Sequence, residues 1–193
     1  MRKIISSKEK EEQDKKKQRI FAIIIGVVMA LSTAGFAINF ATTQQKVKYN
    51  GLTFTQSEKG WVPKGYSLVT TYLPGEVENI SLSGIIDPED FNSKVYLIEL
   101  PYVRAGVVEF VQNVPIQSYQ QACLAKYENE SFCADVPTKS CEDANSGNVM
   151  LILDEDNETS VTYTKYCLTI KGSQEDITKG VDKAIFSAYG IIK

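Results

Sequence analysis

The sequence predicts an α+β protein, with a mainly antiparallel sheet packed by helices and stapled by disulfides, behind an N-terminal transmembrane helix. Three observations lead to this fold class. An uncharged apolar stretch begins at Ile20, four cysteines lie in the C-terminal half, and strand-like alternation is followed by one amphipathic C-terminal helix. We divide the chain into a charged cytoplasmic tail (1–19), a transmembrane helix (20–41) and an extracytoplasmic domain (42–193).

The apolar stretch matches a lipid bilayer in length. Residues 20–38 are uncharged and mostly apolar, and at about 1.5 Å per residue they span about 28 Å, close to the roughly 30 Å hydrocarbon core. Residues 1–19 carry a net charge of +4, whereas the residues after the stretch carry −7. The positive-inside rule therefore predicts a single-pass protein of the cell membrane, with its N-terminus in the cytoplasm.

Removal of this segment after export is the main alternative. A secretory signal has a short basic head, an apolar run of about 7–15 residues and a small-residue cleavage site, and residues 34–37 ("AGFA") resemble such a site. The longer head and longer apolar run favour a retained signal anchor. Gly26, Ala30 and Ala34 recur every four residues, a spacing that lets membrane helices pack closely into a homo-oligomer; ordinary membrane-helix composition is the alternative.

Composition excludes several functional classes. The chain has no histidine, which removes the commonest general base and metal ligand. The acidic domain lacks a basic patch, so we expect no nucleic-acid partner. We expect no catalytic residue, cofactor or metal site, and hence no enzyme; a carboxylate-based hydrolase is the alternative that this composition leaves open.

The cysteines predict two disulfides. Cys123, Cys133, Cys141 and Cys167 are even in number and all follow the predicted membrane helix, and they lack the close pairs of structural zinc sites. Three connectivities are possible, and free buried thiols are the alternative. We favour Cys123–Cys133 and Cys141–Cys167 because each closes a local loop, worth about 2.7 and about 3.5 kcal/mol in the loop-closure model.

Three Asn-x-Ser/Thr sequons make Asn79, Asn129 and Asn157 candidates for glycosylation, and Asn157 in its acidic turn is the best of them. The stretch Leu153–Glu158 concentrates carboxylates but lacks the spacing of an EF-hand. We interpret it as a solvated turn.

Alternation predicts the first half of the domain. Apolar residues on both sides of Asn50-Gly51 indicate a hairpin, with a bulged single strand as the alternative. A second turn at 58–60 and strands at 66–73 and 94–100 follow, the last of them central. Asp87, followed by proline, is typical of the start of a short helix.

The second half contains one ambiguous region. Residues 103–114 fit either a helix or a strand, and Pro115 ends the element in both cases. Beyond it, helical spacing relates Ile116, Tyr119, Cys123, Leu124 and Tyr127. Residues 149–153 and 159–172 are typical of antiparallel strands.

The C-terminal helix is the clearest element. Ser173 with Asp176 resembles a capping box, and Gly190 marks the end. One face is apolar, formed by Ile177, Val181, Ala184, Ile185, Ala188 and Tyr189.

Several stretches, "YNGLTFTQSEKGWV", "LPGEVENI", the cysteine cluster and the closing "VMLILDEDNETSVTYTKYCLTIKG…ITKGVDKAIFSAYGII", resemble a loose group of membrane-anchored extracytoplasmic proteins of small-genome, DPANN-type archaea. The resemblance implies topology and host type, and it supplies no catalytic residue. Trp61 and Tyr66 are candidates for a partner surface, since such side chains anchor interfaces, although strands also favour them. We expect a membrane-bound domain that makes envelope or protein–protein contacts, with a minor-pilin-like subunit of a surface assembly as the alternative.

Overall fold

The structure is a computed structural model that describes residues 15–30, 45–100 and 104–192. The chain divides into two units, residues 1–44 and 45–193. In the first unit, residues 15–30 form a helix whose large apolar side chains are all exposed, from Ile20 at 53% to Met29 at 66%. Within the described ranges, no helix combines the length and the apolar character needed to cross a membrane.

The predicted membrane span falls only partly within the described residues. Gly26 and Ala30 lie on the helix of residues 15–30. Ala34 and the remainder of the span to Ala41 lie outside the described residues. The packing face formed by these small residues therefore stays a prediction.

The second unit begins with a three-stranded antiparallel sheet, β1 (Lys46–Tyr49), β2 (Leu52–Ser57) and β3 (Gly60–Pro63). Asn50 and Gly51 join β1 to β2 with φ angles of 46° and 82°. Positive φ at both turn residues is what a two-residue hairpin requires, so the predicted hairpin is confirmed. The predicted turn before Gly60 joins β2 to β3.

The second sheet has six strands in the order β4-β8-β9-β7-β5-β6. Its strands are β4 (Ser81–Ser83), β5 (Lys94–Glu99), β6 (Ser118–Ala122), β7 (Asn148–Glu155), β8 (Ser160–Thr164) and β9 (Cys167–Gly172). The β8–β9 hairpin is antiparallel, whereas the other neighbouring strands run parallel. The α+β class is confirmed, but "mainly antiparallel" is wrong for this larger sheet because β9 lies between β7 and β8 and runs parallel to β7.

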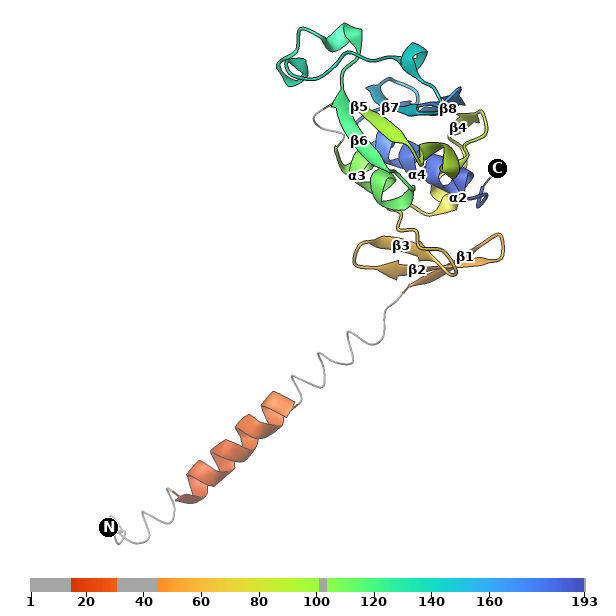
Figure 1. The fold of residues 1–193 in the computed structure, drawn as a ribbon. Coiled ribbons are helices and arrows are strands. Elements are labelled where there is room, and N and C mark those ends of the chain that lie inside the picture. The colour runs from red at the N-terminus through yellow and green to blue at the C-terminus, as the bar shows by residue number, and fades with distance from the viewer. Residues whose placement is uncertain (1–14, 31–44, 101–103, 193) are drawn as a thin grey trace, which may run out of the picture. The chain divides into compact units, whose positions relative to one another are not determined.

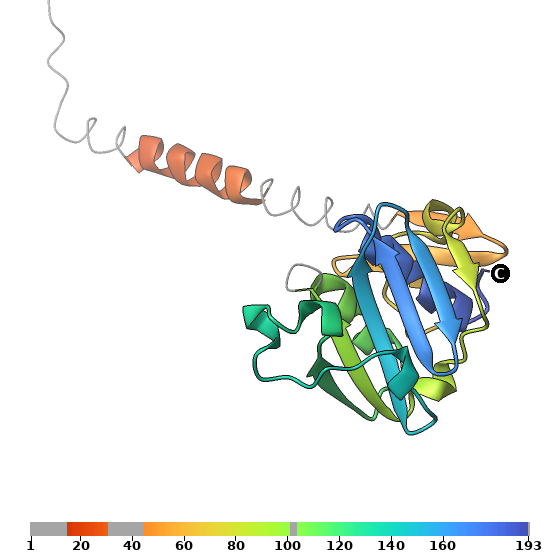
Figure 2. The ribbon, with the colours of Figure 1, turned by 90° about the horizontal axis from the view of Figure 1, so that it is seen from above.

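The helices lie between the two sheets (Figures 1 and 2). They are α2 (Pro74–Val77), α3 (Arg104–Asn113) and α4 (Asp176–Ala188), and short 3-10 turns η1 (Pro88–Phe91), η2 (Ala125–Tyr127), η3 (Ser131–Cys133) and η4 (Cys141–Asp143) lie in the connections. Phe54 of β2 meets Phe186 of α4 edge to face, with ring centroids 6.0 Å apart. This contact places the small sheet against the helical layer.

The C-terminal helix has the predicted amphipathic packing. Ile177, Val181 and Ile185 are buried in the main core. The Ser173 Oγ accepts a hydrogen bond from the Asp176 backbone N–H and donates one to Asp176 Oδ2 at 2.7 Å. The predicted capping box is nevertheless wrong, because α4 begins at Asp176 and its N-cap is Glu175, which makes no side-chain cap hydrogen bond.

The two faces of the large sheet have separate cores. Alternate residues such as Val149, Leu151 and Leu153 of β7 face the helices. Met150 and Ile152 point to the opposite face, where they form a second, smaller cluster. A strand buried on both faces reads as a continuous apolar run, which explains the sequence of β7.

Two predicted elements are wrong. Residues 66–73 form no strand beyond an isolated bridge between Trp61 and Thr70. Side chains instead of a neighbouring strand accept the backbone N–H groups of residues 69, 71, 72 and 73. The helix predicted after Pro115 is replaced by β6 and η2. Parallel pairing of β6 with β5 satisfies its backbone, so tertiary pairing overrides the helical spacing.

Other local predictions are confirmed. Residues 104–113 are a helix, which resolves the ambiguity before Pro115. Asp87 Oδ1 accepts the Glu89 N–H at 2.9 Å and so caps η1. The strand predicted at 94–100 is β5, although it lies next to the edge strand β6 and not at the centre of the sheet.

Candidate functional site

A loop held by two disulfides covers the face of the large sheet opposite the helices. We call residues 123–147 the stapled loop. Cys123–Cys133 joins the end of β6 to η3, with Cα atoms 5.8 Å apart, and Cys141–Cys167 joins η4 to β9, with Cα atoms 5.3 Å apart. This is the connectivity that the sequence favours.

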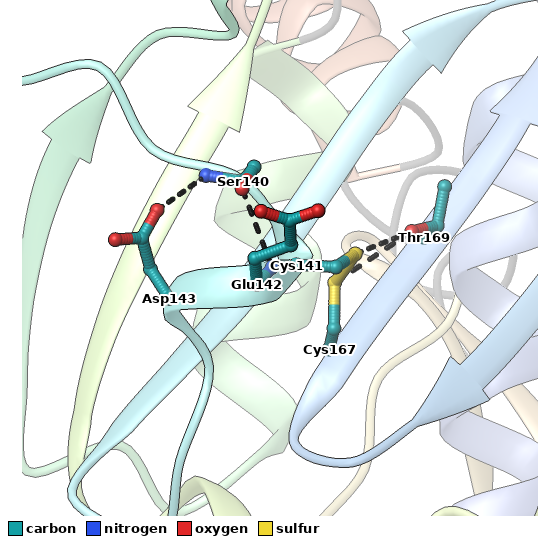
Figure 3. The surroundings of a disulfide bond; sticks show 6 residues. All are labelled: Ser140, Cys141, Glu142, Asp143, Cys167 and Thr169. Carbon is teal, nitrogen blue, oxygen red and sulfur yellow. Dashed lines mark hydrogen bonds between the residues drawn. A yellow bond between two sulfur atoms is a disulfide. The ribbon is translucent and has the colours of Figure 1, made fainter.

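The second disulfide fixes the loop to β9. Figure 3 shows the Cys141–Cys167 bond beside Thr169, whose Oγ1 lies 3.7 Å and 3.8 Å from the two sulfur atoms. The Ser140 backbone N–H donates to Asp143 Oδ2 at 2.9 Å and caps the adjoining turn. A covalent bond and a capped turn therefore hold this end of the loop in place.

An ion pair provides a third attachment. Lys126 Nζ donates to both carboxylate oxygens of Asp154 on β7, at 2.8 Å and 2.6 Å, and the Tyr127 hydroxyl donates to Oδ1 at 2.9 Å. Burial lowers the pKa of Lys126, but the hydrogen bonds to Asp154 outweigh it and the pKa is raised overall. Asp154 is buried, so the interpretation of its acidic stretch as a fully solvated turn is wrong at this residue.

Strand β6 forms one border of the large sheet (Figure 2). It pairs with β5, and in the part of the chain that the structure describes no strand pairs with its other side. Four of its five residues, 118–121, are exposed, and the strand contains neither a charged residue nor a proline.

Two hollows open beside β6. The hollow on the side of the stapled loop has a volume of about 220 Å³ and is lined by Ala122, Cys123, Phe132 and Val136. The hollow on the helix side has about 230 Å³ and is lined by Val107, Val108, Val111, Gln112 and Tyr119. Leu97, Glu99 and Gln121 line both hollows.

Exposed apolar side chains collect at these hollows. Val108 is 45% exposed, Tyr119 61% and Phe132 37%. We call these three side chains the β6 edge surface. In the described part of the domain, the other strongly exposed large apolar side chain is Ile85, at 90%, which follows β4 near the opposite border of the sheet.

A buried carboxyl pair lies elsewhere, where α3 and α4 meet. Burial raises the pKa of Asp182 to about 10, and the charge and hydrogen bonding of Glu109 add to the effect. Asp182 is therefore protonated at neutral pH. Its Oδ2 accepts the Tyr72 N–H at 2.7 Å, and Glu109 Oε1 accepts the Thr71 N–H at 2.6 Å.

These carboxyl groups hold the connection between the two sheets. Besides the two bonds just described, Asn113 Oδ1 accepts the Val69 N–H at 2.8 Å, and Glu76 Oε2 accepts the Leu73 N–H at 2.7 Å. Asp182 has no exposed surface, and neither acid of the pair lines a hollow at β6. The arrangement therefore binds backbone amides and offers no access to a substrate.

The predicted partner-surface residues lie away from β6. Trp61 and Tyr66 are half-buried and pack against the main core, and the Tyr66 ring meets Tyr189 edge to face at 6.4 Å. Their role in partner binding stays a prediction.

The remaining predicted positions are accessible for modification. Asn79, Asn129 and Asn157 are all exposed, as an acceptor asparagine must be. Over the described residues, no three acidic or cysteine side chains gather as metal ligands.

The β6 edge surface was missed from the sequence because its residues come from three separate elements. The helical spacing of Tyr119 also placed it on a buried face. The signal that would have revealed the site is local: an uncharged strand without proline, followed by a cysteine-bounded loop that contains an exposed phenylalanine.

Comparison with known proteins gives no match to a family model, to a curated protein or to a solved structure. The resemblance to archaeal membrane-anchored proteins therefore stays a prediction.

Proposed function

We propose that this chain is a membrane-anchored extracytoplasmic domain that binds another protein of the cell envelope through the β6 edge surface. The observation that carries the proposal is the gathering of Val108, Tyr119 and Phe132 beside two hollows at an open sheet border. Exposed apolar side chains that cluster around hollows are typical of protein contact sites.

The size of the hollows favours a protein over a small molecule. Small-molecule sites usually have volumes of about 300–1,000 Å³, and the hollows at β6 have about 220 Å³ and about 230 Å³. Each suits a single inserted side chain. Tyrosine and phenylalanine at the border are also side chains that commonly supply binding energy in protein interfaces.

The membrane attachment is supported by the N-terminal segment. The helix of residues 15–30 exposes apolar side chains on all sides from Ile20 onward, and such a helix requires a lipid or protein environment. Basic residues precede it and the net charge of the chain after it is negative, which favours a cytoplasmic N-terminus. Both disulfides then lie in the compartment where disulfides persist.

The buried acids give no support to the alternative of a carboxylate-based hydrolase. Asp182, which lies beside Glu109, is the acid whose pKa burial raises. Both are hydrogen-bonded to the backbone of residues 71 and 72. A general acid must reach its substrate, and Asp182 is fully enclosed.

Site-specific photo-crosslinking in native membranes tests the proposal. A photoreactive residue at Phe132 or Val108 is expected to form a discrete adduct with one partner protein. The matched control is the same residue at Ile85, which is more exposed but stands outside the β6 edge surface. Equal adducts from Ile85, or no discrete adduct from either test position, would contradict the proposed surface.

A further inference from the structure

The border of β6 lacks the usual protection of an edge strand along residues 118–122. Directly beyond them the stapled loop pairs with the edge, where Cys123 donates to the Pro137 carbonyl and accepts from the Lys139 N–H. Natural edges carry charged residues, prolines or bulges that prevent another strand from pairing. Residues 118–122, "SYQQA", contain none of these charges or prolines, and they pair with β5 in continuous parallel register. The border therefore retains unpaired backbone groups in a geometry that accepts a further strand.

The two hollows would accept side chains of such a strand. One hollow is lined by Phe132 of the stapled loop and the other by Val108 of α3, and both share Leu97, Glu99 and Gln121. Successive side chains of a strand point to opposite faces of the sheet. The side chains that enter the hollows should therefore be apolar, like the exposed residues that line them.

Acidic residues near the hollows indicate which charges the partner carries on either side of its apolar residues. Glu99 lines both hollows. Exposed Glu130 and Asp135 border Phe132 and Val136 in the stapled loop. Basic residues on either side of the apolar pair would complement this acidic surrounding.

A second copy of this chain fits less well. In a two-fold dimer β6 would pair with itself, and its side chains are mostly polar, with two glutamines and a serine among five residues. The same acidic residues would also face each other across the dimer. An apolar strand with basic flanks satisfies both the hollows and the charge.

We infer that the envelope partner binds as an extended segment that adds a strand to β6, with apolar residues in the two hollows and basic residues at its flanks. This inference rests on the proposed function and specifies how the β6 edge surface is used. Backbone hydrogen bonds to β6 fix the register of the added strand, and the hollows select the side chains that the partner presents.

Blocked synthetic peptides provide a direct test. The probe is fluorescein-Lys-Thr-Val-Ile-Val-Thr-Lys-amide, whose fluorescence anisotropy is followed as the full chain in detergent is added. Two further peptides carry N-methyl groups at alternate backbone nitrogens, one on the even and one on the odd positions. Only alternate residues of an edge-paired strand turn their N–H groups towards the neighbour. One methylated peptide is therefore expected to bind about 30-fold more weakly, and the other nearly as well as the probe.

Hydrogen exchange locates the bound peptide. Binding is expected to slow exchange of amides within residues 118–122, and Phe132→Ser is expected to weaken binding about tenfold. Ile85→Ser is the control variant and should bind as the original chain does. Absence of binding, equal weakening by both methylation patterns, or unchanged exchange in β6 would each overturn the strand inference.

The two experiments fail independently. If crosslinking from Phe132 captures a discrete partner but the peptides do not bind, then the surface is used without strand addition. If neither gives a signal, then the proposed function fails together with the inference.

Discussion

Replacement of Asp182 by asparagine tests the protonation of the buried carboxyl pair. An asparagine side chain is close in shape to a protonated aspartic acid, so its oxygen can still accept the Tyr72 N–H, now 2.7 Å from Asp182 Oδ2. Its amide can donate to Glu109. Unlike aspartic acid, asparagine does not ionise, so unfolding of the variant releases no proton at this position.

The sign of the effect follows from the raised pKa. The pKa of Asp182 is about 10 in the folded chain, compared with about 3.9 for an unfolded aspartate. Its contribution to stability is therefore fully present below about pH 4 and is lost progressively as the pH rises towards 10. Across this window, folding takes up one proton, which corresponds to about 1.4 kcal/mol of unfolding free energy per pH unit.

We expect the unfolding free energy to fall more steeply with rising pH in the original chain than in Asp182→Asn. Between pH 6 and pH 8 the original chain should lose about 3 kcal/mol of unfolding free energy relative to Asp182→Asn. Urea denaturation monitored by tryptophan fluorescence measures this difference. Trp61 is the single tryptophan of the chain, and its backbone N–H donates to the carbonyl oxygen of Thr70, next to the residues that Glu109 and Asp182 bind. Glu175→Gln removes an exposed carboxylate near the start of α4 and serves as the control. Parallel pH profiles for the original chain and Asp182→Asn would refute a protonated Asp182.

Three further outcomes concern the loop, the helix packing and the disulfides. Lys126→Met should lower the free energy of unfolding by about 2 kcal/mol in urea denaturation, because Asp154 loses a charged hydrogen-bond donor; the result fails if stability is unchanged. Gly180→Ala should cost about 1–3 kcal/mol, because the added Cβ would lie 2.6 Å from Ile170 Cγ2, and a stability equal to that of the original chain would show that α4 can shift. Non-reducing peptide mapping should recover two intramolecular disulfides in the connectivity described above, and a free thiol at any cysteine would contradict it.

Elements with strong local signals could be predicted from the sequence. Asn50-Gly51 specifies a hairpin because only certain residues tolerate positive φ in succession. The apolar face of α4 defines a helix, although its N-cap is Glu175 and not Ser173. The disulfide pairing follows from loop closure, because the two bridges join cysteines that are separated by only 10 and 26 residues.

Elements that depend on contacts with distant parts of the chain could not be predicted from the sequence. Tyr119 has helical spacing with its neighbours, but β6 is fixed by pairing with β5, more than twenty residues away along the chain. Residues 69–73 have strand-like composition, yet side chains of α2, α3 and α4 accept the backbone N–H groups of residues 69, 71, 72 and 73. Glu109 and Asp182 lie on different helices, so no sequence spacing indicates that they meet.

The position of β9 has a consequence for the order in which the chain can complete its fold. β9 is the last strand, yet it separates β7 from β8, and β4 joins the sheet only through β8. The chain is synthesised from its N-terminus. Until residues 167–172 have been made, β7 lacks its neighbour on one side and Cys141 lacks its disulfide partner Cys167. High separation between pairing strands slows folding. The strands that precede β9 in the chain can therefore pair wrongly until residues 167–172 have been made.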